Sequence, residues 1–319
     1  MKKVLIILGK KKWNGPVFSQ EETKTYQHCY EYLYQWAEEE DVLMFRASVD
    51  WYDKKRNIFK YAWTFKNNKW ERAYNIKPDL IYDKTKLTPE NHYFKQELKN
   101  HFPIINNTDF TLLLDNKFFT SLLFPKFSKK HYLINSFDDL KSVAKKIKGS
   151  RIVLKKNSGS GGKDVIITEK NKINKLKRVD FKDFSVQEFI DSSKGIKGIT
   201  DSYHDLRLVF INDELIYSYI RTPKKGSLLA NLSQGGSMRI VKPKDLPKST
   251  KALIKNVKEV LDSYNPKIYT IDIMFDEKQS PWIVELNTMP GLYFSPDQAL
   301  WMKKMYLKLI KLFKNSILK

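Results

Sequence analysis

The sequence predicts an open α/β domain at the N-terminus, followed by a larger region of the α+β class. Three observations predict this. Strand-like and helix-like segments alternate over roughly the first 105 residues, and antiparallel strand pairs dominate from about residue 106 onward. In addition, 41% of the 319 residues are hydrophobic, which is enough to form hydrophobic cores. At roughly 100–200 residues per domain, this length predicts two or three domains.

The first region is interpreted as alternating strands and helices because short apolar runs are separated by amphipathic stretches and turn residues. Ser19 followed three residues later by Glu22 fits a capping box, which predicts a helix from there to about Glu38. Asn67-Asn68 lies between two strand-like runs and predicts a hairpin turn. The expected strands are Lys3–Leu8, Val42–Arg46, Ile58–Phe65, Lys69–Tyr74, Leu80–Tyr82 and Pro103–Ile105, and the second helix is Pro89–Leu98.

The second region differs because many of its strands follow one another directly, which predicts antiparallel pairs. Helices are expected over Phe110–Leu123, from a capping box at Ser136–Asp139 to Ile147, over Lys251–Leu261 and over Trp301–Leu318. Strands are expected over Arg151–Lys156, Asp164–Thr168, Phe184–Ile190, Leu206–Ile211, Leu215–Arg221, Ile268–Phe275 and Trp282–Leu286. The last helix is amphipathic and basic, and we interpret its lysines as a solvated face rather than a membrane anchor.

Basic side chains exceed acidic ones, 58 Lys and Arg against 36 Asp and Glu, which gives a formal net charge of +22. Such a field attracts polyanions, but nearly all the basic residues are scattered lysines, whereas nucleic-acid surfaces cluster arginine. Nucleic acid is therefore not an expected partner.

We find no apolar run long enough for a membrane span and no signal-peptide core, and the one cysteine, Cys29, cannot form an internal disulfide. These features predict a cytoplasmic protein without membrane association.

The most specific candidate for a metal-binding site lies in the hairpin expected near the C-terminus. We place Asp276 opposite Pro281 across a loop of four residues, so that Asp272 faces Glu285 on the adjacent strand. Opposed like charges among Ile, Met, Val and Leu are destabilising unless something binds them. Asn287 projects from the same face as Glu285, and two carboxylates with an amide oxygen suit Mg²⁺ completed by phosphate and water. The alternative is an acidic pair that faces solvent.

A glycine-rich segment, residues 157–163, separates two of the expected strands. It does not fit the Walker spacing, because Lys163 is followed by Asp164 and a strand rather than by a helix, and it lacks the G-x-G-x-x-G spacing. A strand–loop–strand unit of this kind can fold over phosphates, with backbone N–H groups and neighbouring lysines as ligands. Taken alone, the segment is equally compatible with a mobile hairpin loop.

Taken in order, these segments resemble those of the ATP-grasp superfamily, in particular the branch of the ribosomal-protein glutamate ligases and glutathione synthetases. The resemblance covers nearly the whole chain from about Thr108. The matching segments are Asp115–Lys117, Ile152–Lys155 with Gly159–Gly162, Val186–Ile190, Asp205–Arg207, Tyr219–Thr222, Asn231 with Gly235-Gly236, and Asp272 with Glu285–Gly291. The resemblance implies an ATP-grasp architecture with an N-terminal open α/β (Rossmann-like) domain over 1–107. Two α+β subdomains would then grip the nucleotide, a central one with the glycine-rich flap over 108–186 and a C-terminal one with the magnesium and substrate sites over 187–319.

The resemblance also implies which residues bind ATP. Lys117 and Lys155 would contact the phosphates, although Lys156 competes with Lys155 because the strand register is open. The remaining implied ATP ligands, from the flap and from the strand that holds adenine, are Ser160, Gly161, Gln187, Glu188 and Ile190.

The same resemblance implies catalytic and metal-binding residues. Arg207 and Arg221 would hold the transferred phosphoryl group and the substrate carboxylate, and Asn231 would help position that anion. Two Mg²⁺ ions, for which Mn²⁺ is a substitute, would be held by Asp272, Glu285 and Asn287.

The connection between Ile190 and Asp205 is longer than this branch leads us to expect. The residue that binds the ribose hydroxyls therefore stays open, with Asp191 as the first candidate. His204 could act as a base, but a single histidine beside an acid is more often a structural hydrogen-bonding residue.

The implied reaction is ATP-dependent carboxylate–amine ligation. A substrate carboxylate attacks the γ-phosphate of ATP, and an amine then displaces phosphate from the acyl phosphate. The substrates would be small molecules or peptides that carry an amino-acid, peptide or protein carboxylate, and the positive field would favour acidic ones. The alternatives are a catalytically silent ATP-grasp nucleotide-binding module and a basic nucleic-acid-binding protein. The sequence does not fix the oligomeric state, and a homodimer and a tetramer are both compatible with it.

Overall fold

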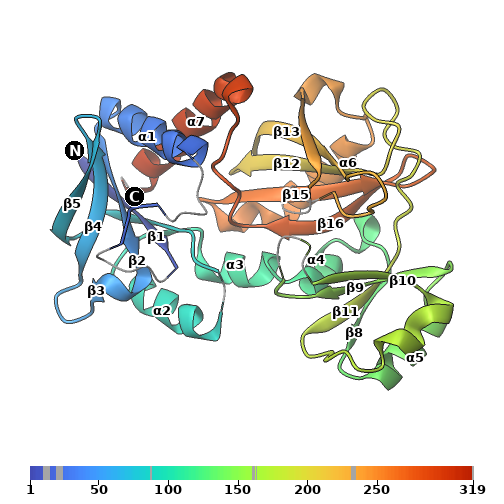
Figure 1. Cartoon of the computed structure of the whole chain (residues 1–319). Helices are drawn as coiled ribbons and strands as arrows, with labels where there is room; N and C mark the ends of the chain where they lie inside the picture. The colour runs from blue at the N-terminus through green and yellow to red at the C-terminus, as the bar shows by residue number, and fades with distance from the viewer. Residues whose placement is uncertain are drawn as a thin grey trace. The chain divides into compact units, whose positions relative to one another are not determined.

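The computed structural model describes residues 1–9, 15–18, 24–86, 88–159, 162, 164–230 and 235–317 (Figure 1). The chain divides into two compact units. The first unit comprises Met1–Thr111, Tyr264–Ile268 and Met289–Lys319, and the second comprises Leu112–Ser263 and Tyr269–Thr288. The capping box predicted at Ser19–Glu22 lies outside the described residues.

The first unit is built on a mixed sheet with the strand order β3-β4-β2-β1-β6-β7, in which β5 also pairs with β4. Strands β1, β2, β6 and β7 run parallel, and the others are antiparallel to their neighbours. Residues 4–7 of the central strand are fully buried, as expected for a parallel strand that is covered on both faces. The strands are β1 (Lys2–Leu8), β2 (Val42–Ser48), β3 (Tyr52–Asp53), β4 (Ile58–Lys66), β5 (Lys69–Ile76), β6 (Leu80–Asp83) and β7 (Ile104–Ile105).

Helices α1 (Lys24–Glu39), α2 (Pro89–Lys99) and α7 (Ala299–Ile317) belong to the first unit. The C-terminal helix α7 packs against α1, β1 and β6 (Figure 1), and most of its apolar residues are buried, although Leu300 and Leu307 are exposed. This packing supports the interpretation of its lysines as a solvated face, since the apolar face is already covered. Within the described ranges, no helix combines the length and the apolar character that a bilayer crossing requires.

The second unit contains two antiparallel sheets. The four-stranded sheet has the order β10-β9-β11-β8, and α5 (Phe137–Lys146) packs on it around a core that includes Leu140, Leu154 and Val186. The five-stranded sheet has the order β14-β13-β12-β15-β16. The strands are β8 (His131–Ile134), β9 (Arg151–Lys156), β10 (Val165–Glu169), β11 (Phe184–Glu188), β12 (Asp205–Ile211), β13 (Glu214–Thr222), β14 (Ser237–Val241), β15 (Ile268–Phe275) and β16 (Pro281–Asn287), and α6 (Thr250–Leu261) completes the unit. The predicted fold class, an α/β sheet followed by α+β sheets, is confirmed.

One predicted helix is wrong, because Phe110–Leu123 is not continuous. It forms two helices, α3 (Thr108–Leu114) and α4 (Lys117–Leu123). The break follows from two polar side chains. Asn116 caps α4, since its Oδ1 accepts hydrogen bonds from two backbone N–H groups of the first turn, and Asp115 accepts hydrogen bonds from the backbone N–H and the hydroxyl of Thr288. The break therefore places Lys117 at the start of a helix beside the end of β16.

Candidate functional site

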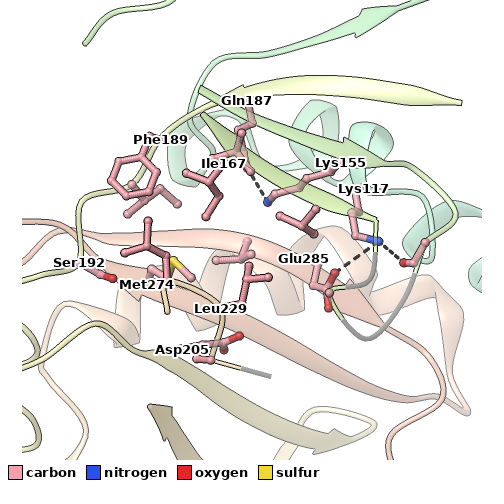
Figure 2. Close-up of a pocket in the computed structure, with 18 of the residues that line it drawn as sticks. Lys117, Lys155, Ile167, Gln187, Phe189, Ser192, Asp205, Leu229, Met274 and Glu285 are labelled. Carbon is pink, nitrogen blue, oxygen red and sulfur yellow. Dashed lines mark hydrogen bonds and ion pairs between the residues drawn. The ribbon is translucent and has the colours of Figure 1, made fainter. Parts of the chain in front are cut away.

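A pocket opens between the two sheets of the second unit (Figure 2). Both sheets and the segments that connect them contribute side chains. Those from the four-stranded sheet are Val153, Lys155, Lys156, Val165, Ile167, Gln187 and Glu188, and those from the five-stranded sheet are Asp205, Met274, Val284 and Glu285.

One half of the pocket is apolar. Ile167 of β10, Met274 of β15 and the connecting residues Phe189 and Leu229 line it (Figure 2). Strand β11 ends at Glu188, and the chain continues along the pocket wall through residues 189 and 190. A slot with apolar walls beside an extended main-chain segment is suited to a flat aromatic base, because the walls bury the ring and the main chain reads its edge.

The other half of the pocket carries two lysines. Lys155 is buried, and its Nζ donates a hydrogen bond to Oε1 of Gln187 over 2.7 Å. The Nζ of Lys117 donates to the backbone carbonyl of Gly159 and lies 3.5 Å from Oε2 of Glu285. The adjacent Lys156 also lines the pocket but is only partly buried. The buried lysine of the pair is thus Lys155.

Burial lowers the pKa of Lys155 to about 8, and the positive charge of Lys117 acts in the same direction. The unfolded chain keeps this proton up to the ordinary pKa of 10.5, so between about pH 8 and 10 it binds more protons at this site than the folded chain. The free energy of unfolding therefore rises with pH in that window, by roughly 1–2 kcal/mol from this residue.

We expect Lys155→Met to lose this part of the pH dependence, because methionine has no proton to release. Urea unfolding of the wild type and the variant at pH 7.5 and 9.5 measures the difference between the two slopes. Lys156→Met is the matched control, and it should keep the wild-type slope. Equal slopes for the wild type and Lys155→Met would contradict the prediction.

A buried cluster of four charged side chains lies beside the pocket. Arg207 donates to both carboxylate oxygens of Asp272, with Nε 2.6 Å from Oδ1, and Nη2 of Arg221 lies 2.7 Å from Oδ2 of the same residue. Arg221 also donates to Asp205, which lines the pocket. Burial raises the pKa of Asp272, but the two guanidinium groups outweigh it and hold that pKa below its usual value. Burial raises the pKa of Asp205.

The pairing of Asp272 with Glu285 across β15 and β16 is confirmed. The register closer to the turn is different, because Pro281 pairs with Phe275 rather than with Asp276. A bulge after Asp272 then shifts the register by one residue. The physical reason is that the Asp276 carboxylate closes the turn, where it accepts hydrogen bonds from two backbone N–H groups and from the indole of Trp282.

At this end of the pocket the carboxylate of Glu285 is only loosely paired and could bind a divalent cation together with phosphate, whereas both oxygens of Asp272 accept hydrogen bonds from guanidinium groups. The side chain of Glu285 is 21% exposed, and its oxygens lie 3.5 Å from Lys117 and 3.9 Å from Arg207, which are loose ion pairs. Among the described residues, no three His, Cys, Asp or Glu side chains gather as a metal cluster. Asp272, Glu285 and Asn287 therefore supply too few oxygens for a cage, and phosphate and water would have to complete the shell, as is usual for Mg²⁺.

The long connection between β11 and β12 is anchored to the β15–β16 hairpin. The side chain of Gln279 bonds two main-chain groups of the connection, and Nε2 of His204 accepts a hydrogen bond from the backbone N–H of Phe275 over 3.0 Å. Burial lowers the pKa of His204, which supports its interpretation as a structural residue. Ser192 and Tyr203 line the pocket.

The ribose candidate Asp191 has a different environment. Its Oδ1 accepts a hydrogen bond from the backbone N–H of Ser193, which closes a local turn, and it is not among the residues that line the pocket. The connection thus contributes Ser192 and Tyr203, rather than this carboxylate, to the wall.

The structure brings most of the predicted site residues together. Those that line the pocket are Lys117, Lys155, Gln187, Glu188, Ile190 and Glu285. Arg207, Arg221 and Asp272 form the adjoining charged cluster, and Asn287 is the last residue of β16. The predicted residues Ser160, Gly161 and Asn231 lie outside the described residues. Sequence reasoning assigned no role to Asp205, although its position two residues before Arg207 on β12 places both on one face.

Comparisons with known proteins identify relatives of this chain. The family model described as the RimK-like ATP-grasp domain matches residues 115–300. A curated relative from Vibrio parahaemolyticus, named probable alpha-L-glutamate ligase, is 29% identical over 159 residues, which are 49% of this chain and 48% of the relative. The chain thus spans about half the length of the curated relatives it matches.

Two solved structures share the fold over almost the whole chain. D-alanyl-alanine synthetase A from Vibrio cholerae superposes with a TM-score of 0.67 at 13% identity, and the match covers 100% of this chain and 99% of that one. An ATP-grasp ligase from Chryseobacterium gregarium, solved with ADP and a leader and core peptide, gives a TM-score of 0.64 at 12% identity, with 98% and 97% covered. At these identities the likeness shows the fold, with its N-terminal mixed sheet and two antiparallel sheets.

Proposed function

This chain belongs to the RimK-like ATP-grasp family, and from that membership we propose that it is an ATP-dependent carboxylate–amine ligase. One observation carries the proposal. A single pocket combines an apolar slot with two lysines, and its cationic end adjoins Glu285 and the buried Asp272 cluster. The slot suits a purine base, the lysines suit phosphates, and the carboxylate beside them suits a phosphate-bound divalent cation.

In this proposal the adenine lies in the apolar half, against Ile167, Met274 and the main chain of residues 188–190. Lys117 and Lys155 bind phosphate oxygens in the other half. Lys155 takes this role in preference to Lys156 because it is the buried one, and a lysine already removed from water loses less hydration when it binds an anion.

Asp272, Glu285 and Asn287 would hold two Mg²⁺ or Mn²⁺ ions, which neutralise charge on the phosphates when bound. The substrate carboxylate attacks the γ-phosphorus, ADP leaves, and an amine then displaces inorganic phosphate from the acyl phosphate. Arg207, 12% exposed and on the same face of β12 as the pocket-lining Asp205, is the better placed arginine to hold the substrate carboxylate. Arg221 is bound to two carboxylates, and its role is to hold Asp272 and Asp205 in place.

The names of the relatives narrow the substrate class. A curated relative is named an alpha-L-glutamate ligase, and one solved relative was crystallised with a peptide. We therefore propose an amino acid, a peptide or a protein as the source of the carboxylate and an amino acid such as glutamate as the amine. The +22 net charge favours acidic substrates, because it raises their local concentration at the surface.

The test is ADP formation with a pool of carboxylates, ATP and MgCl₂, with hydroxylamine as a general nucleophile. Hydroxylamine traps an acyl phosphate as a hydroxamate, which mass spectrometry identifies without knowledge of the natural amine. We expect ADP and one hydroxamate to appear together, and neither to appear when the carboxylate is omitted. Tight nucleotide binding without ADP formation from any carboxylate would instead assign the chain to a silent nucleotide-binding module.

A further inference from the structure

Three polar side chains form a hydrogen-bonded row behind the two pocket lysines. His131 of β8 lies with Nε2 2.7 Å from the hydroxyl of Ser185 on β11, and that hydroxyl donates to Oδ1 of Asn157 over 2.7 Å. Ser185 and Asn157 are buried, and none of the three is among the residues that line the pocket. The row therefore has no direct contact with the proposed nucleotide.

The hydrogen bonds define the protonation state of His131. The hydroxyl of Ser185 donates to Asn157, and Nδ1 of the imidazole has no hydrogen-bond partner among the described residues, so this arrangement favours the tautomer that donates to Ser185 through Nε2–H. Nδ1 then carries the lone pair, and in the described part of the chain this buried atom has no hydrogen-bond partner. Burial lowers the pKa of His131 to about 3, and the charges of Lys155 and Lys117 act in the same direction. His131 is thus a neutral donor.

The row touches the main chain of both lysines. The backbone carbonyl of Asn157 accepts a hydrogen bond from the backbone N–H of Lys117 over 3.3 Å. Ser185 lies opposite Lys155 in the β9–β11 pairing, and its hydroxyl is 3.4 Å from the carbonyl of that lysine. The imidazole ring packs edge to face on Phe118, which follows Lys117 in α4. Each residue of the row thus contacts one of the segments that carry Lys117 and Lys155.

We propose that His131 is a positioning residue for the phosphate end of the pocket, and that it acts through Ser185 and Asn157 on Lys117 and Lys155. This inference rests on the proposed function, in which those lysines bind the phosphates of ATP. A neutral donor suits this place, because a third positive charge behind two lysines would weaken their protonated forms. The side-chain hydrogen bonds given for the row lead to the segments of the two lysines, so the effect should fall on phosphate binding.

The test compares the binding of ADP and of adenosine by His131→Leu and His131→Gln. Leucine keeps much of the bulk but cannot donate, whereas the side-chain amide of glutamine can donate from a position similar to Nε2. We expect His131→Leu to weaken Mg-ADP binding about tenfold and to leave adenosine binding within about twofold of the wild type, since only phosphate contacts move. His131→Gln should restore ADP binding to within about threefold of wild type. His101→Leu, the same substitution in the first unit, is the matched control for both ligands.

Equal weakening of ADP binding and adenosine binding would overturn the inference, because it would show damage to the whole pocket. Unchanged ADP binding by a folded His131→Leu protein would also overturn it. Ser185→Ala, which breaks the same row with a smaller change of volume, should give the same split between ADP and adenosine if His131→Leu does not fold. Wild-type protein that binds no Mg-ADP would overturn the proposed function itself. Normal ADP formation by the wild type together with an unaffected His131→Leu variant would overturn the positioning role alone.

Discussion

Glu285→Gln is expected to reduce ADP formation on the order of 10³-fold while the protein stays folded. The glutamine keeps the shape of the side chain and the pairing of β15 with β16, but it removes the negative charge that faces the pocket. That charge is the more accessible of the two carboxylates proposed to hold Mg²⁺, since Glu285 is 21% exposed and Asp272 is 1% exposed. Its two ion pairs are loose, at 3.5 and 3.9 Å, so their loss should destabilise the protein less than the loss of the hydrogen-bonded carboxylate of Asp272.

A coupled assay for ADP at saturating ATP and MgCl₂ measures the loss of activity, and a thermal melt measures stability. Glu277→Gln is the matched control, because Glu277 lies at the turn of the same hairpin, is 54% exposed and makes only a loose surface pair with Lys194. It should retain full activity. Near-normal turnover by Glu285→Gln would contradict the assignment of this carboxylate to the metal.

Asp272→Asn is expected to lower the free energy of unfolding by about 3–5 kcal/mol, in addition to abolishing activity. The reason is that this carboxylate neutralises two buried guanidinium groups, those of Arg207 and Arg221. An amide oxygen can still accept a hydrogen bond, but it leaves the two positive charges with Asp205, which pairs with Arg221, and with Glu285, which lies 3.9 Å from Arg207. The two neighbouring acidic residues of the hairpin therefore differ sharply in their expected effect on stability.

Denaturant unfolding of Asp272→Asn against the wild type measures this difference. Asp138→Asn is the matched control, because Asp138 is 85% exposed and pairs only with Lys141 on the surface of α5, so its loss should cost less than about 1 kcal/mol. An Asp272→Asn protein as stable as the wild type would show that the arginines are not held by this carboxylate. The buried cluster would then need a different account.

The helix break at residues 115–116 shows why part of the fold was not predictable. Apolar residues continue at helical spacing on both sides of the break, so the local pattern favours one helix. Asp115 accepts hydrogen bonds from Thr288, which is 173 residues away in the chain. Only the folded chain brings these two residues together, and the sequence pattern therefore could not reveal that the helix must restart at Lys117.

In the hairpin of β15 and β16, the sequence predicted one strand pairing correctly and another incorrectly. Counting across a four-residue loop placed Asp272 opposite Glu285, and the structure agrees. The count was nevertheless wrong at the turn, where Asp276 closes the loop and a bulge further along the hairpin offsets the shift. The one-residue shift at the turn and the one-residue bulge thus cancel each other. Only the strand pairing in the folded structure reveals either of them.

By itself, the sequence determined the class and order of the elements and the order of the charged and glycine-rich segments, because hydrophobic periodicity and turn residues act over a few neighbouring positions. The tertiary structure decided which of two adjacent lysines is buried, and it decided that Asp272 is bound by arginines 65 and 51 residues away. It also placed His131 within hydrogen-bond distance of Ser185, behind the two lysines. The physical reason is that burial, ion pairing and protonation depend on groups far apart in the chain, and packing alone brings those groups within a few ångströms of one another.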